Sequence, residues 1–208
     1  RPSTRLTATV APTRTPTVTA TPVPALITSP TPQTIREADI PSEAEGRTHL
    51  SVELDEAPET DTKERFAAWG LNLLESLDKR LWYASVANAD ITTVGAIDGV
   101  RRADLIEPED KLAEPLRTGV KPFSYQLRPN NRIAYTVLFH RDVTADEVRG
   151  LGQSIDVNFE DFDPNVFGIV RALTVNVPTD GLQALSAADI VSWIEPAPPP
   201  VEDQNLTA

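Results

Sequence analysis

Alternating apolar and polar residues predict a series of short strands. Leu50, Val52 and Leu54 fall on one face of residues 49–54, and a period of two is typical of a strand with one buried side. The same pattern predicts strands at 73–77, 81–86, 100–106, 132–139, 155–159, 173–177 and 190–195. The chain is therefore predicted to contain two successive sets of short strands.

Each set of strands is interrupted by two segments with helical spacing. Phe66 and Trp69 lie three residues apart in the first segment, and Ile91, Val94 and Ile97 repeat that spacing in the second. The expected N-caps of the four helices are Asp61, Asp90, Thr144 and Thr179. The third of these caps opens a capping box, because a glutamate follows three residues later.

The order β-α-β-β-α-β thus occurs twice, which predicts an internal duplication. Residues 105–108 (LIEP) match residues 193–196 (WIEP) at an offset of 88. This order is the ferredoxin-like split motif, with two helices on one face of a four-stranded antiparallel sheet. We therefore predict an α+β fold with two tandem ferredoxin-like units. The other face of the second sheet is expected to bind a protein surface.

The first 34 residues have a different composition, with seven Pro, eleven Thr and no acidic residue. Such a segment cannot form a core, so we expect a disordered, extended Thr/Pro-rich linker. Spacers of this kind favour a secreted or cell-surface protein. The predicted boundaries are 1–46 for the linker, 47–114 for the first unit, 115–131 for a connector, 132–197 for the second unit and 198–208 for an extended Pro-rich tail.

Composition and charge exclude several classes of function. The 208 residues carry a net charge of −12, which opposes binding to nucleic acid or to an anionic membrane. The sequence has no Cys, so it has neither a disulfide framework nor a thiol nucleophile. No apolar run approaches the roughly 18 residues of a membrane-spanning helix.

Candidate catalytic and metal-binding patterns are weak. His49 and His140 are the two His residues of the chain, and we expect both to be ordinary residues at strand borders. Residues 161–165 (DFDPN) begin like a calcium loop, but Val166 and Ala172 stand where Gly and Glu are needed. We therefore expect no catalytic residue, no metal, no cofactor and no small-molecule substrate.

Several short runs resemble a known family. Residues 173–178 (LTVNVP), 182–185 (LQAL) and 190–196 (IVSWIEP) are similar to the end of subtilisin-type propeptides, the I9 inhibitor-like family. Residues 70–74, 82–86 and 100–112 resemble the upstream prodomain of larger bacterial subtilisin-like proteases. The resemblance covers residues from about 47 to 200.

The resemblance implies a function for the whole chain. It implies a propeptide of a secreted subtilisin-like (S8) serine protease, which assists folding of the cognate catalytic domain and temporarily blocks its active site. The chain itself is not expected to be an enzyme, because the Asp-Ser-Gly, His-Gly-Thr and Gly-Thr-Ser signatures of that class are absent from the sequence.

The same resemblance suggests which residues contact the protease. The extended tail would enter the substrate cleft as an added strand, and Glu195 would cap helix N-termini of the enzyme. The expected protease-binding residues are Glu195, Val201, Asn205, Leu206, Thr207 and Ala208. The alternative is a stand-alone tandem ferredoxin-like protein-interaction module on an extracellular stalk.

Overall fold

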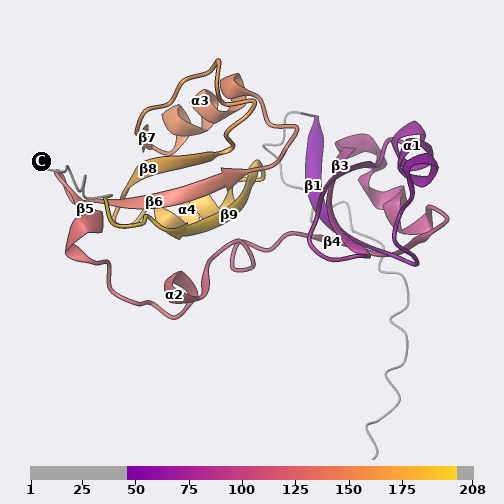
Figure 1. The fold of residues 1–208 in the computed structure, drawn as a ribbon, viewed down its shortest axis with the longest axis horizontal. Helices are drawn as coiled ribbons and strands as arrows, with labels where there is room; N and C mark the ends of the chain where they lie inside the picture. The colour runs from indigo at the N-terminus through magenta and orange to yellow at the C-terminus, as the bar shows by residue number, and fades with distance from the viewer. Residues whose placement is uncertain (1–45, 201–208) are drawn as a thin grey trace, which may run out of the picture.

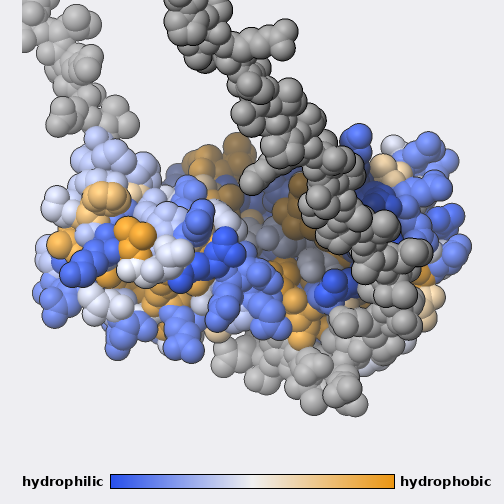
Figure 2. Space-filling model, turned by 90° about the horizontal axis from the view of Figure 1, so that it is seen from below, coloured by the Kyte–Doolittle hydropathy of each residue, from blue (hydrophilic) through white to orange (hydrophobic). Residues whose placement is uncertain are grey.

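The computed structural model describes residues 46–200, which form a mixed α/β structure with two antiparallel sheets (Figure 1). The predicted linker, apart from Gly46, and residues 201–208 of the predicted tail lie outside the described residues. Seen from below (Figure 2), the described surface is mostly hydrophilic, and hydrophilic residues lie between its apolar spots.

The first sheet has four strands in the order β2-β3-β1-β4. Its elements are β1 (Arg47–Leu54), α1 (Thr60–Ala68), β2 (Asn72–Ser76), β3 (Leu81–Ala87), the 3₁₀ helix η2 (Asn88–Ala96) and β4 (Val100–Leu105). Leu50, Val52 and Leu54 all lie in the core of this unit, as their alternation predicts. Phe66 from α1 and Ile91 from η2 close the core on the same side of the sheet.

The second sheet has five strands, with β7, β8, β6 and β9 in the places of β2, β3, β1 and β4. Its elements are β5 (Leu127–Arg128), β6 (Arg132–Phe139), α3 (Ala145–Ser154), β7 (Asn158–Phe159), β8 (Ala172–Pro178), α4 (Leu182–Ala187) and β9 (Val191–Pro196). Strands β1 and β6 share the same burial pattern along all eight residues. The extra strand β5 pairs with the start of β6.

The segment between the two sheets contributes to the second one. It holds α2 (Glu114–Arg117), the 3₁₀ helix η3 (Ser124–Gln126) and β5. Leu112 and Leu116 pack against the core of the second unit. Residues 115–131, predicted to be a connector, therefore carry part of the second sheet and of its packing.

The repeat is present in the order of strands, but it has no single offset of 88 residues. Strand β6 begins 85 residues after β1, whereas β9 begins 91 residues after β4. Val52 pairs with Ala103 in the first sheet, and Val137 pairs with Ile194 in the second. The two Ile-Glu-Pro runs are therefore not at equivalent positions, because the second unit is longer between its first and last strands.

Three of the expected N-caps are also wrong. Asp61 lies inside the first turn of α1, Asp90 lies within η2, and Gly181 rather than Thr179 occupies the N-cap of α4. The predicted strand 155–159 shrinks to β7, because Ile155 ends α3 and Asp156 takes a positive φ of 53°. An acid or threonine near a helix start does not fix the first helical residue when packing decides it.

The predicted cap of α3 is confirmed. Thr144 Oγ1 accepts a hydrogen bond from the Glu147 amide at 3.3 Å, and the Glu147 carboxylate accepts one from the Thr144 amide at 2.7 Å. Together these bonds satisfy two donors at the start of the helix.

Replacing Thr144 with Ala is expected to lower the free energy of unfolding by about 1 kcal/mol, since the Glu147 amide loses the hydroxyl oxygen that accepts its hydrogen bond. Urea denaturation followed by far-UV circular dichroism measures the loss. Ser154→Ala at the exposed C-terminal end of the same helix is the control. Equal effects of the two substitutions would contradict the capping role.

Candidate functional site

The face of the second sheet opposite its core carries two rows of side chains. One row joins Glu195, Thr136 and Thr174 across β9, β6 and β8, and the next joins Trp193, Leu138 and Ala172. Residues paired directly across strands share a face of the sheet, and alternate residues of these strands face the core. A polar row with a carboxylate therefore lies beside an apolar row with an aromatic ring.

Glu195 lies near the end of β9 and is half-buried. It makes no ion pair within residues 46–200. Of the residues predicted to bind a protease, it is the one that the structure describes. Val201, Asn205, Leu206, Thr207 and Ala208 lie outside the described residues.

The chain that leaves β9 is held by the segment before β5. The buried Gln126 side chain donates from Nε2 to the Ala197 carbonyl at 2.9 Å and accepts from the Phe123 amide at 2.9 Å. The Ala197 amide also donates to the Ala134 carbonyl. These bonds fix where the chain departs from the second sheet.

The outer edge of β9 is also covered by the chain itself. The Ile194 amide donates to the Lys111 carbonyl at 2.7 Å, and the Ala113 amide donates to the Ile194 carbonyl at 2.9 Å. Leu112 forms a parallel bridge with Ile194. A partner strand could therefore not add to the sheet at this point of β9 without displacing residues 111–113.

The two units meet through His49, whose ring is fully buried. His49 lies on β1, on the face opposite the core of the first unit, beside Ser85 of β3. Its Nδ1 is 2.6 Å from Asp189 Oδ2, and its Nε2 is 2.9 Å from Asp142 Oδ1. Both carboxylates belong to the second unit, between α4 and β9 and between β6 and α3, respectively.

His140 and Arg47 complete this junction. The rings of His49 and His140 stack with centroids 4.1 Å apart and planes 6° apart. Arg47 Nε is 3.1 Å from Asp142 Oδ2, and Arg47 Nη2 is 2.8 Å from Glu147 Oε1. Basic residues at the start of β1 in the first unit thus contact acidic residues of the second unit.

The junction shifts the acid–base properties of its members. Burial disfavours the charged ring of His49, but its hydrogen bonds to Asp142 and Asp189 outweigh this and raise its pKa. For Asp142, the opposing effect of burial is overcome by the bond to His49, which holds the pKa of this carboxyl well below its usual range. Burial lowers the pKa of His140 to about 2, and the neighbouring His49 adds to this shift.

Lys111 is a further buried charge at this junction. Its Nζ donates to the Ala188 carbonyl at 2.8 Å, and burial lowers its pKa to about 8 although Asp189 opposes the shift. His49 lies near the start of β1 and His140 directly follows β6, as expected, but their burial and their stacking on each other were not predicted. Their positions in the sequence gave no signal of this contact, because it joins residues from different units.

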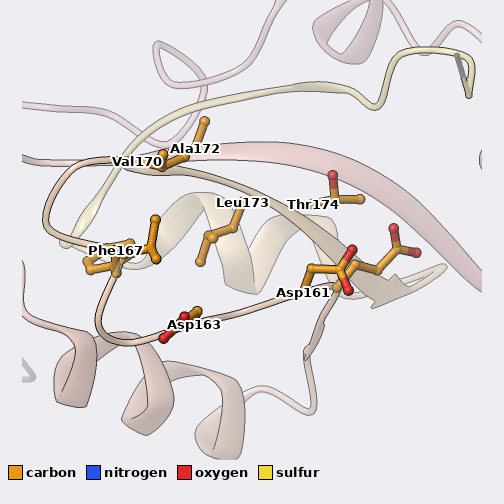
Figure 3. A pocket seen from close by; sticks show the side chains of 9 residues that line it. Asp161, Asp163, Phe167, Val170, Ala172, Leu173 and Thr174 are labelled. Carbon is orange, nitrogen blue, oxygen red and sulfur yellow. The ribbon is translucent and has the colours of Figure 1, made fainter.

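A hollow of about 360 Å³ lies beside β8, under the loop that follows β7 (Figure 3). Phe167 and Leu173 line the hollow, and Asp161 and Asp163 lie on the loop segment beside it. Asp163 accepts a hydrogen bond from the Asn165 amide at 2.9 Å, which closes a local turn. These exposed carboxylates belong to the segment that resembles the start of a calcium loop.

Within residues 46–200 no group of three or more His, Asp or Glu side chains is arranged to hold a metal ion. In the same part of the chain, none of the helices has the length and apolar character needed to cross a bilayer. A scan against protein-family models and a search of curated proteins both found no match to this sequence.

Proposed function

We propose that this chain is the propeptide region of a secreted subtilisin-like serine protease, and that it acts as intramolecular chaperone and temporary inhibitor of the catalytic domain. In this proposal the second unit contacts the enzyme through the exposed face of its sheet. The residues beyond Pro200 then enter the substrate cleft. The chain itself cleaves no peptide bond.

The proposed fold of each unit is ferredoxin-like. It is supported by the element order, with β1, α1, β2, β3, η2 and β4 matched by β6, α3, β7, β8, α4 and β9. The equivalent order of strands in the two sheets supports it as well. This architecture suits the proposed role, because helices on one side of the second sheet leave its opposite face available for a partner.

The partly exposed face of the second sheet, opposite its core, is the observation that carries the proposal. Its apolar row, centred on the half-buried Trp193 and Leu138, offers remaining apolar surface that a folding enzyme can cover. Glu195 in the neighbouring row is half-buried and unpaired within residues 46–200, so its carboxylate is available for the partial positive charge of helix N-termini.

The fixed exit of the chain supports the second part of the proposal. Gln126 holds the Ala197 carbonyl, and three prolines follow at 198–200. Proline cannot continue a helix, so these residues lead away from the sheet in an extended form. A segment that starts at a fixed point and stays extended is suited to enter a cleft as an added strand.

Replacing Trp193 with Ser is expected to weaken inhibition of a subtilisin-type protease about thirtyfold, roughly 2 kcal/mol, because buried Trp residues dominate protein interfaces. The measurement is the inhibition constant for hydrolysis of a chromogenic peptide. Trp69→Ser is the matched control, since Trp69 is 45% exposed at the end of α1 in the first unit. Equal inhibition by the unmodified chain, Trp193→Ser and Trp69→Ser would contradict a contact between the sheet face and the protease.

A further inference from the structure

The junction between the two units is built from groups that can gain or lose protons. His49 reaches Asp142 and Asp189 of the second unit through its two ring nitrogens. Its main-chain amide also donates to Asp189 Oδ1 at 3.1 Å. The side chain of His49 is therefore at the centre of the contacts that join the units.

The geometry fixes the number of protons on His49. A carboxylate oxygen only accepts hydrogen bonds, so each ring nitrogen must carry a hydrogen to bond its partner. A neutral imidazole has one N–H, whereas the imidazolium ion has two. Contacts of 2.6 and 2.9 Å to two different carboxylates thus require the charged ring.

The stacked neighbour must carry one proton fewer. His140 is 1% exposed, and its Nε2 has no hydrogen-bond partner. A charged His140 would place a second imidazolium 4.1 Å from that of His49. Arg47 and Lys111 would add to the repulsion. The junction therefore holds one charged and one neutral ring face to face.

We propose that this junction is a proton-dependent lock, in which the two units stay docked while His49 is charged and His140 is neutral, and are released when either ring changes its charge. The lock goes beyond the proposed function and does not depend on it, because both rings and all their partners lie within residues 46–200.

The two rings give the lock opposite dependences on pH. The raised pKa of His49 means that its contribution is complete below about pH 6.5, the unperturbed value, and is lost as the pH rises through the raised value. The lowered pKa of His140 means that docking weakens as the pH falls below about 6.5, since only the released ring takes up a proton. Docking is therefore strongest near pH 6.5 and weaker on both sides.

The other titratable groups around the two rings also affect how docking depends on pH. Asp142 and Glu147 have lowered pKa values and stay charged until the solution is strongly acidic. Lys111 has a pKa of about 8 in the docked state, so it loses its proton at a lower pH there than in the released state. This difference favours docking at alkaline pH and offsets part of the stability that is lost when His49 loses its proton. Tyr83 packs edge-on against His140, and the raised pKa of the Tyr83 hydroxyl keeps this side chain neutral at the pH values over which the two His rings change their charge.

Energy transfer between two dyes on the full chain tests the lock, and the absence of native Cys makes labelling specific. Ala96→Cys on η2 and Gln153→Cys on α3 place one exposed dye site in each unit. The measured quantity is the urea concentration at which transfer falls by half, from pH 5 to 10. Circular dichroism is followed in parallel, to separate release of the units from unfolding.

The wild-type midpoint is expected to peak near pH 6.5 and to fall on both sides. His49→Gln is expected to lower the peak and abolish the alkaline fall, whereas His140→Phe, which keeps a stacking ring, is expected to abolish the acidic fall. Asp163→Asn, an exposed carboxylate outside the junction, is the control and should keep the wild-type profile.

A wild-type midpoint that is constant from pH 5 to 9.5 would overturn the lock, as would the same profile in wild type and His49→Gln. Nitrogen-15 spectra of the two unmodified His rings provide a test that needs no substitution of either ring. The lock predicts two N–H groups on His49 at pH 7 and one on His140 at pH 5. A neutral His49 at pH 7 would overturn it.

Discussion

Replacing His49 with Leu is expected to lower the free energy of unfolding by about 3 to 5 kcal/mol, the usual cost of removing one partner from a buried ion pair. The ring is fully buried between Asp142 and Asp189, whose side chains are 26% and 13% exposed. Leucine fills much of the same volume but leaves both carboxylates facing an apolar group. Urea denaturation at pH 6.5 measures the loss.

His140→Phe provides the matched control for this substitution. His140 is as buried as His49 and stacks on the same ring, but its Nε2 has no partner. A phenyl ring keeps the stacking, so the expected loss is under about 1.5 kcal/mol. If the two substitutions were equally costly, packing rather than the carboxylate pairs would hold the units together.

A chain that ends at Pro200 is expected to inhibit a subtilisin-type protease about a hundredfold less than the full chain, which corresponds to roughly 2.7 kcal/mol. The truncation removes the predicted contacts Val201, Asn205, Leu206, Thr207 and Ala208. It keeps Ala197 and its bond to Gln126, so the second sheet and the exit of the chain remain intact. The inhibition constants of the two chains measure the difference.

The full chain with Asp203→Asn is the control, because it changes a tail charge at a position that is not among the predicted contacts. Equal inhibition by the full and truncated chains would move the contact from the tail to the sheet face. Greater inhibition by the truncated chain would contradict a tail in the cleft altogether.

The elements that the sequence predicted well are those set by local patterns. Leu50, Val52 and Leu54 alternate with polar residues and form one side of β1, and the same period identified β6 and β8. The capping box at Thr144 was also predictable, because donor and acceptor lie three residues apart. In these segments the short-range pattern and the final packing favour the same structure.

The junction could not be predicted in this way. Asp189 lies 140 residues from His49 in the sequence, and nothing near either residue marks the contact. The two Ile-Glu-Pro runs proved not to be equivalent for a related reason, since a matching run does not fix the register of strands whose connections differ in length. Contacts between units depend on how the two sheets dock, which no local period encodes.

The most direct test of the proposed function is to titrate the full chain into a subtilisin-type protease, ideally one encoded in the same reading frame, and to follow hydrolysis of a small peptide substrate. The proposal predicts competitive inhibition, with loss of inhibition as the chain is digested. Full protease activity in the presence of micromolar intact chain would contradict it and favour a stand-alone interaction module.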